Sequence, residues 1–185
     1  MASKKPIPIQ GSRGTPASRR MQRQLAEHIH RLTKDISLSE GAKLTSLKST
    51  DIKNQRQGNM PSLTTLLRVV KKMRWTPESL LSKGKLKKLH GRTRTNDADL
   101  QKVRKRIQEI CRKNDAQTLA DATGIPISNI YQTRTQNAKV GLHTVLSMVH
   151  AGFSASALLL GTPKSAKLLP QAKSSPRAQA KKTKK

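Results

Sequence analysis

The feature that most restricts the fold of this 185-residue chain is an internal repeat with a period of 78 residues. Shifted by that amount, residues 21–82 fall on residues 99–160, within a second block at 97–163, and only the fourth apolar run needs a shift of 79. The matched pairs include Leu25 and Val103, Ile29 and Ile107, Leu32 and Ile110, Leu47 and Ile125, Ile52 and Ile130, and Trp75 and Phe153. Agreement over five successive segments predicts two similar small domains rather than one large one.

The apolar residues of both blocks follow helical spacing. Leu25, Ile29 and Leu32 lie at i, i+4 and i+7, and their counterparts in the second block do the same. This spacing places apolar side chains on one helix face, whereas a strand would alternate them. We therefore predict an all-α fold with five short helices in each domain.

Capping signals predict where several helices begin. Ser37 to Glu40 is a capping box, and Asn114 to Gln117 is its weaker equivalent in the second block. Thr76 followed by Pro77 predicts an N-cap and the first position of a short last helix. Gly58 to Pro61 predicts a turn between two helices.

Most of the positive charge lies outside the two blocks. The chain has 38 Lys and Arg against 10 Asp and Glu, a net charge of +28. Segments 1–20, 83–96 and 164–185 contain no acidic residue and carry +5, +6 and +8. Such segments bury too little apolar surface to offset their ordering entropy. We predict a basic disordered N-terminal arm, a basic linker of weak order and a Lys/Ala/Pro tail, flanking domains at 21–82 and 97–163.

This charge predicts a polyanionic partner, with nucleic acid first and an anionic membrane surface a poor second. No apolar run reaches the roughly 18 residues that span a bilayer, and no secretory signal pattern opens the chain. One cysteine allows no internal disulfide, and five histidines show no metal-ligand spacing. No catalytic motif is present. We therefore expect a cytoplasmic protein that is not an enzyme, with no cofactor, no metal and no membrane partner.

The most informative stretch is Thr118 to Tyr131. Ala120 is a small residue suited to a helix crossing, and Gly124 four residues later can adopt the left-handed turn. Ile125 follows as an apolar plug, and Ile130 is placed to anchor the next helix to the core. This spacing fits a helix-turn-helix. The sequence resembles the lambda-repressor-like, or Cro/CI-type, helix-turn-helix proteins over about residues 25–82 and 103–160.

The two copies depart from that family pattern in different places. In the first, Ser46 replaces the turn glycine, so a serine must adopt the left-handed turn. Gly41 lies inside the second helix of the same copy, where glycine costs about 0.5–1 kcal/mol. In the second copy the fourth helix is expected to be one residue shorter, with Gly152 weakening its end.

The resemblance implies which side chains face DNA. In the first copy these are Ser49, Thr50, Lys53, Asn54 and Gln57, with Arg56 near a phosphate; in the second they are Ile127, Ser128, Tyr131, Gln132 and Thr135, with Arg134 near a phosphate. Asn and Gln can pair with adenine, Lys can reach guanine, and an Ile or Thr methyl can contact the methyl of thymine. For Tyr131, core packing and DNA contact both remain open.

We therefore expect a sequence-specific transcriptional regulator of a bacterium or phage that binds double-stranded DNA as a single-chain pseudo-dimer. The alternative is an architectural, nucleoid-associated protein whose Lys-rich tail neutralises phosphates with little sequence preference. In a third hypothesis one motif docks RNA polymerase or another regulator. Self-association is also compatible with the sequence.

Overall fold

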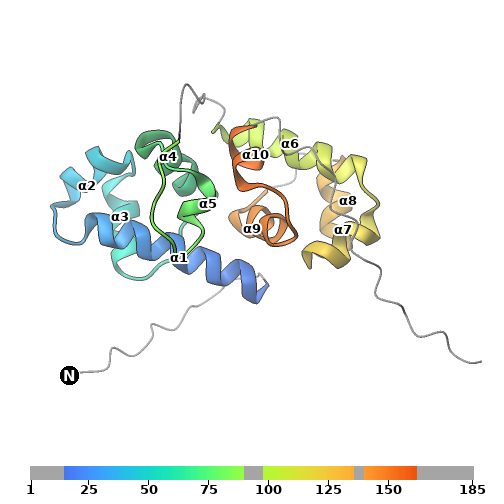
Figure 1. Cartoon of the computed structure of the whole chain (residues 1–185), viewed down its shortest axis with the longest axis horizontal. Coiled ribbons are helices and arrows are strands. Elements are labelled where there is room, and N and C mark those ends of the chain that lie inside the picture. Colours follow the sequence, from blue (N-terminus) through green and yellow to red (C-terminus); the bar gives the residue numbers. More distant parts are fainter. Residues whose placement is uncertain (1–14, 90–97, 136–139, 162–185) are drawn as a thin grey trace, which may run out of the picture.

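The structure, a computed structural model, describes residues 15–89, 98–135 and 140–161. Within these ranges the chain forms ten helices and no strand, apart from one isolated β-bridge between Trp75 and Lys88. The predicted all-α class is confirmed (Figure 1). The C-terminal tail at 164–185, most of the N-terminal arm and the linker beyond residue 89 lie outside the described residues.

The helices fall into two sequence groups of five. The first group is α1 (Pro16–Thr33), α2 (Leu38–Thr45), α3 (Ser49–Arg56), α4 (Leu63–Met73) and α5 (Pro77–Leu80). The second group is α6 (Leu100–Lys113), α7 (Ala116–Thr123), α8 (Ile127–Thr135), α9 (Leu142–His150) and α10 (Ala155–Leu160). Each helix of the first group has a counterpart in the same order in the second.

Two of the predicted helix starts are confirmed and one is wrong. Ser37 and Glu40 form the capping box of α2, and Pro77 is the first residue of α5 after its N-cap Thr76. In α7 the N-cap is Asp115, whose carboxylate accepts from the Thr118 N–H at 2.8 Å. Asn114 instead ends α6, where its amide donates to the Ile110 carbonyl at 2.7 Å. An Asp is an equally good cap and lies exactly one repeat period after Ser37.

The expectation that residues 1–20 are disordered is wrong for residues 15–20. Thr15 is the N-cap of α1 and accepts from the Ser18 N–H at 3.2 Å, and Pro16 begins the helix. Ser18 is only 1% exposed. This first turn is ordered because it packs against the second group of helices, with α1 lying along α9.

The linker is shorter than the predicted 83–96, because residues 83–89 fold back on the first group. The Lys87 carbonyl accepts from the Thr76 N–H at 2.8 Å, and the Leu89 N–H donates to the Arg74 carbonyl at 2.7 Å. The ammonium of Lys88 lies 5.8 Å from the centre of the Trp75 ring. Leucines among the lysines explain the error, since Leu86 and Leu89 pack against the core.

The buried apolar side chains of both groups form one continuous cluster. Trp75 and Phe153 are each 7% exposed, as expected for residues that close the two cores. α9 has 9 residues against 11 in α4, so the fourth helix is shorter by two residues rather than one. Gly152, expected to weaken the end of this helix, lies beyond its C-cap Ala151 with a positive φ of 100°.

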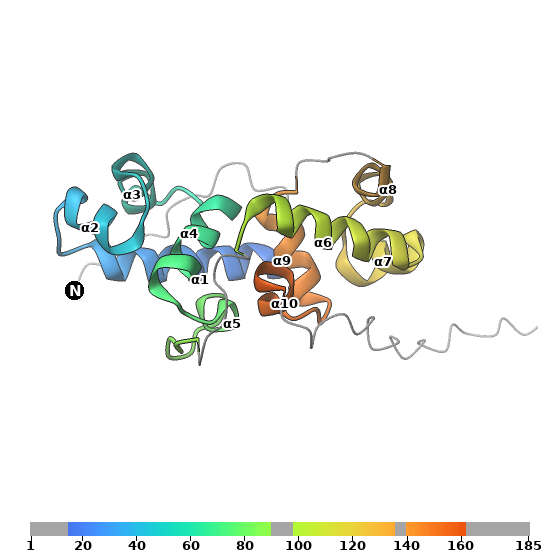
Figure 2. The same cartoon turned by 90° about the horizontal axis from the view of Figure 1, so that it is seen from above.

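The two groups are docked through three pairs of helices: α1 with α9, α4 with α6, and α5 with α10. Figures 1 and 2 show α3 and α8 at opposite ends of the long axis. Figure 2 also shows that both lie along one long side of the molecule, while α5 and α10 lie along the other. The two helices expected to face DNA therefore lie on the same side of the molecule.

Candidate nucleic-acid interface

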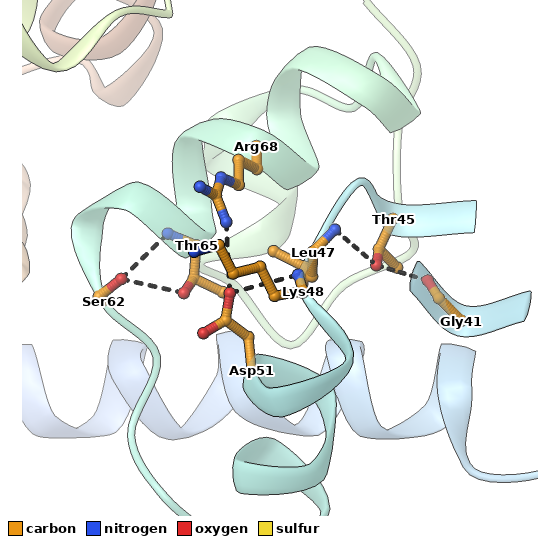
Figure 3. Close-up of polar contacts among 8 residues, drawn as sticks. All are labelled: Gly41, Thr45, Leu47, Lys48, Asp51, Ser62, Thr65 and Arg68. Atoms are coloured by element: carbon orange, nitrogen blue, oxygen red, sulfur yellow. Dashed lines mark hydrogen bonds and ion pairs between the residues drawn. The ribbon is translucent and has the colours of Figure 1, made fainter. Parts of the chain in front are cut away.

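A left-handed turn positions α3 against α2. Ser46 ends α2 with φ 58° and ψ 22°, so the serine does adopt the conformation that glycine would take more easily. The Thr45 hydroxyl donates to the Gly41 carbonyl at 2.7 Å and accepts from the Leu47 N–H at 3.4 Å. Figure 3 shows how this threonine joins the last turn of α2 to the chain that enters α3. The turn is therefore held from both sides despite its unfavourable residue.

The same construction positions α8 against α7. Gly124 ends α7 with φ 67° and ψ 16°. The Thr123 hydroxyl donates to the Leu119 carbonyl at 2.6 Å and accepts from the Ile125 N–H at 3.2 Å. All four residues lie 78 positions after their counterparts around Ser46. Two left-handed turns with the same threonine hydrogen bonds precede the two exposed helices, and only the second also has a bond from its turn N–H, from Gly124 to the Ala120 carbonyl at 2.8 Å.

Isoleucines fix the inner sides of both helices. Ile52 and Ile130 are 0% and 1% exposed, so the predicted anchors are confirmed. A Cβ atom added to Gly41 would lie 3.1 Å from the Ile52 Cδ1 atom, a contact tighter than most real ones. Gly41 thus lets α2 approach α3 closely, which accounts for a glycine inside a helix.

The outer side of α3 is polar. All five expected base-reading residues of the first copy are exposed: Ser49, Thr50, Lys53, Asn54 and Gln57. They lie on the side of the helix away from Ile52 and Gln55, both of which are buried. The face offers hydroxyls at its N-terminal end, then an ammonium and two carboxamides.

The outer side of α8 is uncharged and partly apolar. All five expected residues of the second copy are exposed as well: Ile127, Ser128, Tyr131, Gln132 and Thr135. Ile127 is 37% exposed and Tyr131 51% exposed, and Leu44 is the other large exposed apolar side chain in the part of the chain that the structure describes. The ring of Tyr131 is therefore not packed in the core, although the Arg134 guanidinium lies over it.

Arg56, which we expected near a phosphate, is bound to the protein itself. Its guanidinium donates to the Thr33 carbonyl and to the Ile36 carbonyl, the latter at 2.6 Å. These carbonyls belong to the end of α1 and the turn that follows it. Arg56 thus closes the C-terminal end of α1, where a cation is favoured by the helix dipole.

Arg134 repeats this arrangement in the second group. It donates to the Cys111 carbonyl at 2.6 Å and to the Asn114 carbonyl, which lie 78 positions after Thr33 and Ile36. Its guanidinium carbon lies 5.2 Å from the centre of the Tyr131 ring. Burial raises the pKa of the Cys111 thiol to about 11, although the nearby Arg134 charge acts in the opposite direction. Neither arginine is placed as a phosphate contact.

Asp51 is a feature of α3 that the sequence pattern did not single out. Its carboxylate accepts from the Lys48 N–H at 3.3 Å, at the start of the helix, and pairs with the Arg68 guanidinium at 3.3 Å (Figure 3). The Arg68 cation thus partly neutralises this carboxylate. Spacing alone could have flagged it, because a carboxylate in the first turn stabilises a helix. Its counterpart Asn129 is exposed on α8.

Comparison with protein-family models, with curated proteins and with solved structures finds no match for this chain. In the described ranges, none of the helices is both long and apolar enough to cross a membrane. The same ranges contain no group of three or more His, Cys, Asp or Glu residues that could hold a metal ion.

Proposed function

We propose that this protein is a sequence-specific double-stranded DNA-binding transcriptional regulator. In this proposal the chain is a tandem lambda-repressor-like helix-turn-helix protein, a single-chain pseudo-dimer that inserts α3 and α8 into the major groove. The observation that carries the proposal is the pair of exposed helices that follow similar left-handed turns and lie on the same side of the molecule. In this family of motifs, paired half-sites lie one helical turn, about 34–36 Å, apart.

The chemistry of the two faces supports base reading. Asn54 and Gln57 can each form two hydrogen bonds to adenine, and Lys53 can reach the acceptors of guanine. On α8, Gln132 offers the same carboxamide chemistry, while Ile127 can contact the methyl group of thymine. Ser49 and Thr50 lie in the first turn of α3, where hydroxyls and backbone N–H groups suit a phosphate.

Net charge supports the same proposal without specifying a sequence. A charge of +28 favours binding to a polyanion and fast association with it. The proposal needs no catalytic step, cofactor or metal, and it places the protein on the bacterial nucleoid in the cytoplasm. Arg56 and Arg134 are not part of the proposed DNA face, because their guanidinium groups serve the protein backbone.

The test is selection of bound duplexes from a randomised pool, followed by footprinting. We expect an enriched sequence with two unlike halves. Substituting Lys53 and Asn54 with alanine should weaken binding and relax the preference in one half, and substituting Tyr131 and Gln132 should do so in the other. Each good base contact corresponds to about 1–3 kcal/mol of discrimination.

Matched controls separate base reading from loss of charge or of surface polarity. Lys71→Ala removes an exposed cation from α4, and Gln101→Ala removes an exposed carboxamide from α6. Both should leave the selected sequence unchanged. If only the substitutions of Tyr131 and Gln132 affect DNA binding, the proposal that both α3 and α8 read bases fails. The exposed face of α3 would then be a candidate surface for a protein partner such as RNA polymerase.

The second candidate is an architectural DNA-binding protein. The observation that favours it is a basic cavity of about 520 Å³ outside α3 and α8. The charged residues that line this cavity are Arg19, Arg20, Arg23, Glu27 and Lys83. The basic segment 164–185 adds +8. Deleting that segment should then lower the log–log salt slope by roughly 7 and abolish most binding at physiological salt. A footprint without any enriched sequence would favour this candidate.

A further inference from the structure

The contacts between the two groups of helices are reciprocal. The first helix of each group packs on the fourth helix of the other, as α1 with α9 and α6 with α4. The fifth helices, α5 and α10, pack on each other. The α1–α9 contact is much more extensive than the α4–α6 contact, so the interface approximates a two-fold, isologous one formed within one chain.

Glu78 on α5, although exposed, makes polar contacts across this interface. Its Oε1 atom accepts from the Ser156 N–H at 2.7 Å and from the Ser154 hydroxyl at 3.0 Å. Its Oε2 atom accepts from the Ser156 hydroxyl at 2.6 Å. The carboxylate therefore binds the first turn of α10, where a negative charge is favoured.

Ser156 lies 78 residues after Glu78, so each of these residues faces its own counterpart in the repeat. A residue that meets its counterpart lies on or near the two-fold axis. Pairing two first halves would put Glu78 against a second Glu78, and like charges repel. Pairing two second halves would lack the carboxylate altogether. The carboxylate–serine pair is complementary only between unlike halves.

A second contact ties the interface to the turn before α8. A Cβ atom added to Gly124 would lie 2.8 Å from the Thr15 Cγ2 atom, so the N-cap of α1 touches the turn of the second helix-turn-helix. The docking of the halves thus bears directly on the element that positions α8.

The chain between the halves does not by itself set their separation. Leu89 and Ala98 are nine residues apart, which allows any span up to about 30 Å. If the halves were joined only by that connection, α3 and α8 would sample many separations. A fixed separation requires the interface.

We propose that Glu78 is a positioning residue that holds α3 and α8 at one separation, so that the ligand is a duplex with two unlike half-sites at a single spacing. This inference rests on the proposed DNA-binding function for the identity of the ligand. The positioning itself can be measured without DNA.

The first experiment measures the distance between nitroxide labels on Asn54→Cys and Gln132→Cys by electron–electron double resonance. Both positions are exposed, whereas Cys111 is 2% exposed and its thiol has a pKa of about 11, so it stays unlabelled at pH 7. We expect one narrow distribution in the otherwise wild-type chain. Ser156→Glu should broaden it or add a second population, because it sets two carboxylates against each other.

The decisive variant is the reciprocal exchange Glu78→Ser with Ser156→Glu. Equivalent positions across a two-fold axis can exchange residues, so the double variant should restore the narrow distribution. Gln101→Glu is the matched control, because it adds the same charge at the second position of α6, as Ser156→Glu does in α10. It should leave the distribution unchanged. A double variant that is as broad as the single one, or broader, overturns the role of Glu78.

The second experiment uses duplexes that carry the selected half-sites with zero to twelve base pairs inserted between them. Wild-type affinity should fall roughly a hundredfold when half a helical turn is inserted, the lower end of the gain from joining two binding modules. Ser156→Glu should flatten this profile while each half-site keeps its sequence. Equal wild-type binding at every spacing overturns the inference but leaves DNA binding intact. If no sequence is selected, the proposed function fails, and the label distances still decide whether Glu78 positions the halves.

Discussion

α3 and α8 are supported by the same framework and yet present different surfaces. Behind each helix lie a left-handed turn, a buried isoleucine and an arginine that closes the preceding long helix. In front, α3 offers hydroxyls, carboxamides and Lys53, whereas the outer side of α8 is uncharged and exposes Ile127 and Tyr131. The buried isoleucine, the threonine before the turn and the arginine recur after 78 positions, whereas the five positions expected to read bases all differ. The difference separates what holds the fold from what is available for recognition.

The largest effect should come from the buried anchors. Ile52→Ala and Ile130→Ala should each lower the free energy of unfolding by about 2–5 kcal/mol, since each removes a fully buried side chain. Urea denaturation followed by circular dichroism measures this. Because one apolar cluster joins both groups, a single transition should shift in either variant. Two separate transitions, only one of which moves, would show that the halves unfold independently.

Substituting the arginines that bind backbone carbonyls should have the second largest effect on stability. Arg134→Lys keeps the charge but cannot reach both the Cys111 and Asn114 carbonyls, so stability should fall by about 1–3 kcal/mol. The log–log salt slope of DNA binding should stay the same, whereas Lys53→Ala should reduce it by about 0.9 if Lys53 meets a phosphate or base. Arg134→Ala, if it remains folded, extends the test: a slope reduced by about 0.9 would return Arg134 to the DNA face.

Exchanging the turn residues should give smaller changes of opposite sign. Gly124→Ser introduces a left-handed serine and a Cβ contact with Thr15, which should cost about 1–2 kcal/mol. Ser46→Gly removes strain of about 1–2 kcal/mol but raises the entropy of the unfolded chain by about 0.4–1 kcal/mol. A gain of roughly 0.5 kcal/mol is expected, measurable by thermal unfolding. If both substitutions changed stability in the same direction, the two turns would not be equivalent.

The smallest effect should be the pH dependence of the contact between the halves. Burial alone would raise the pKa of Glu78, but the hydrogen bonds from Ser156 and Ser154 outweigh it and hold that pKa below its ordinary value of 4.5. The contact is therefore fully present above pH 4.5 and is lost as the pH falls through the lowered pKa. The difference in melting temperature between wild type and Glu78→Gln should shrink over that range. If this difference in melting temperature grew as the pH fell, the ionised Glu78 carboxylate would not be what stabilises the contact.

Sequence predicted the framework well where a local pattern carries the information. The capping box at Ser37, the left-handed turn at Ser46 and the burial of Ile52 and Ile130 each depend on residues close in the chain. Contacts between distant segments were missed. Nothing local marks Glu78 as the partner of Ser156, and the leucines that fold residues 83–89 onto the core are hidden by the surrounding lysines.

The carbonyl contacts of the two arginines were missed for a different reason. A cation on an exposed helix of a basic protein suggests a phosphate contact, and charge alone does not distinguish it from a side chain that binds carbonyls. The repeat held the missing signal: Arg56 and Arg134 match, whereas the five expected base-reading positions of the two copies differ. When two copies present different exposed faces, a residue that is identical at matched positions of both is expected to support the fold.

The unlike faces of α3 and α8 have one more consequence. A symmetric dimer on a duplex looks the same from either end, so its complex has no direction. If the proposed function holds, a protein with α3 at one end of its long axis and α8 at the other, the first carrying Lys53 and the second Tyr131, should bind a given site in only one orientation. The complex would then have a defined polarity on the duplex, so that different ends of the protein would face the upstream and the downstream neighbour.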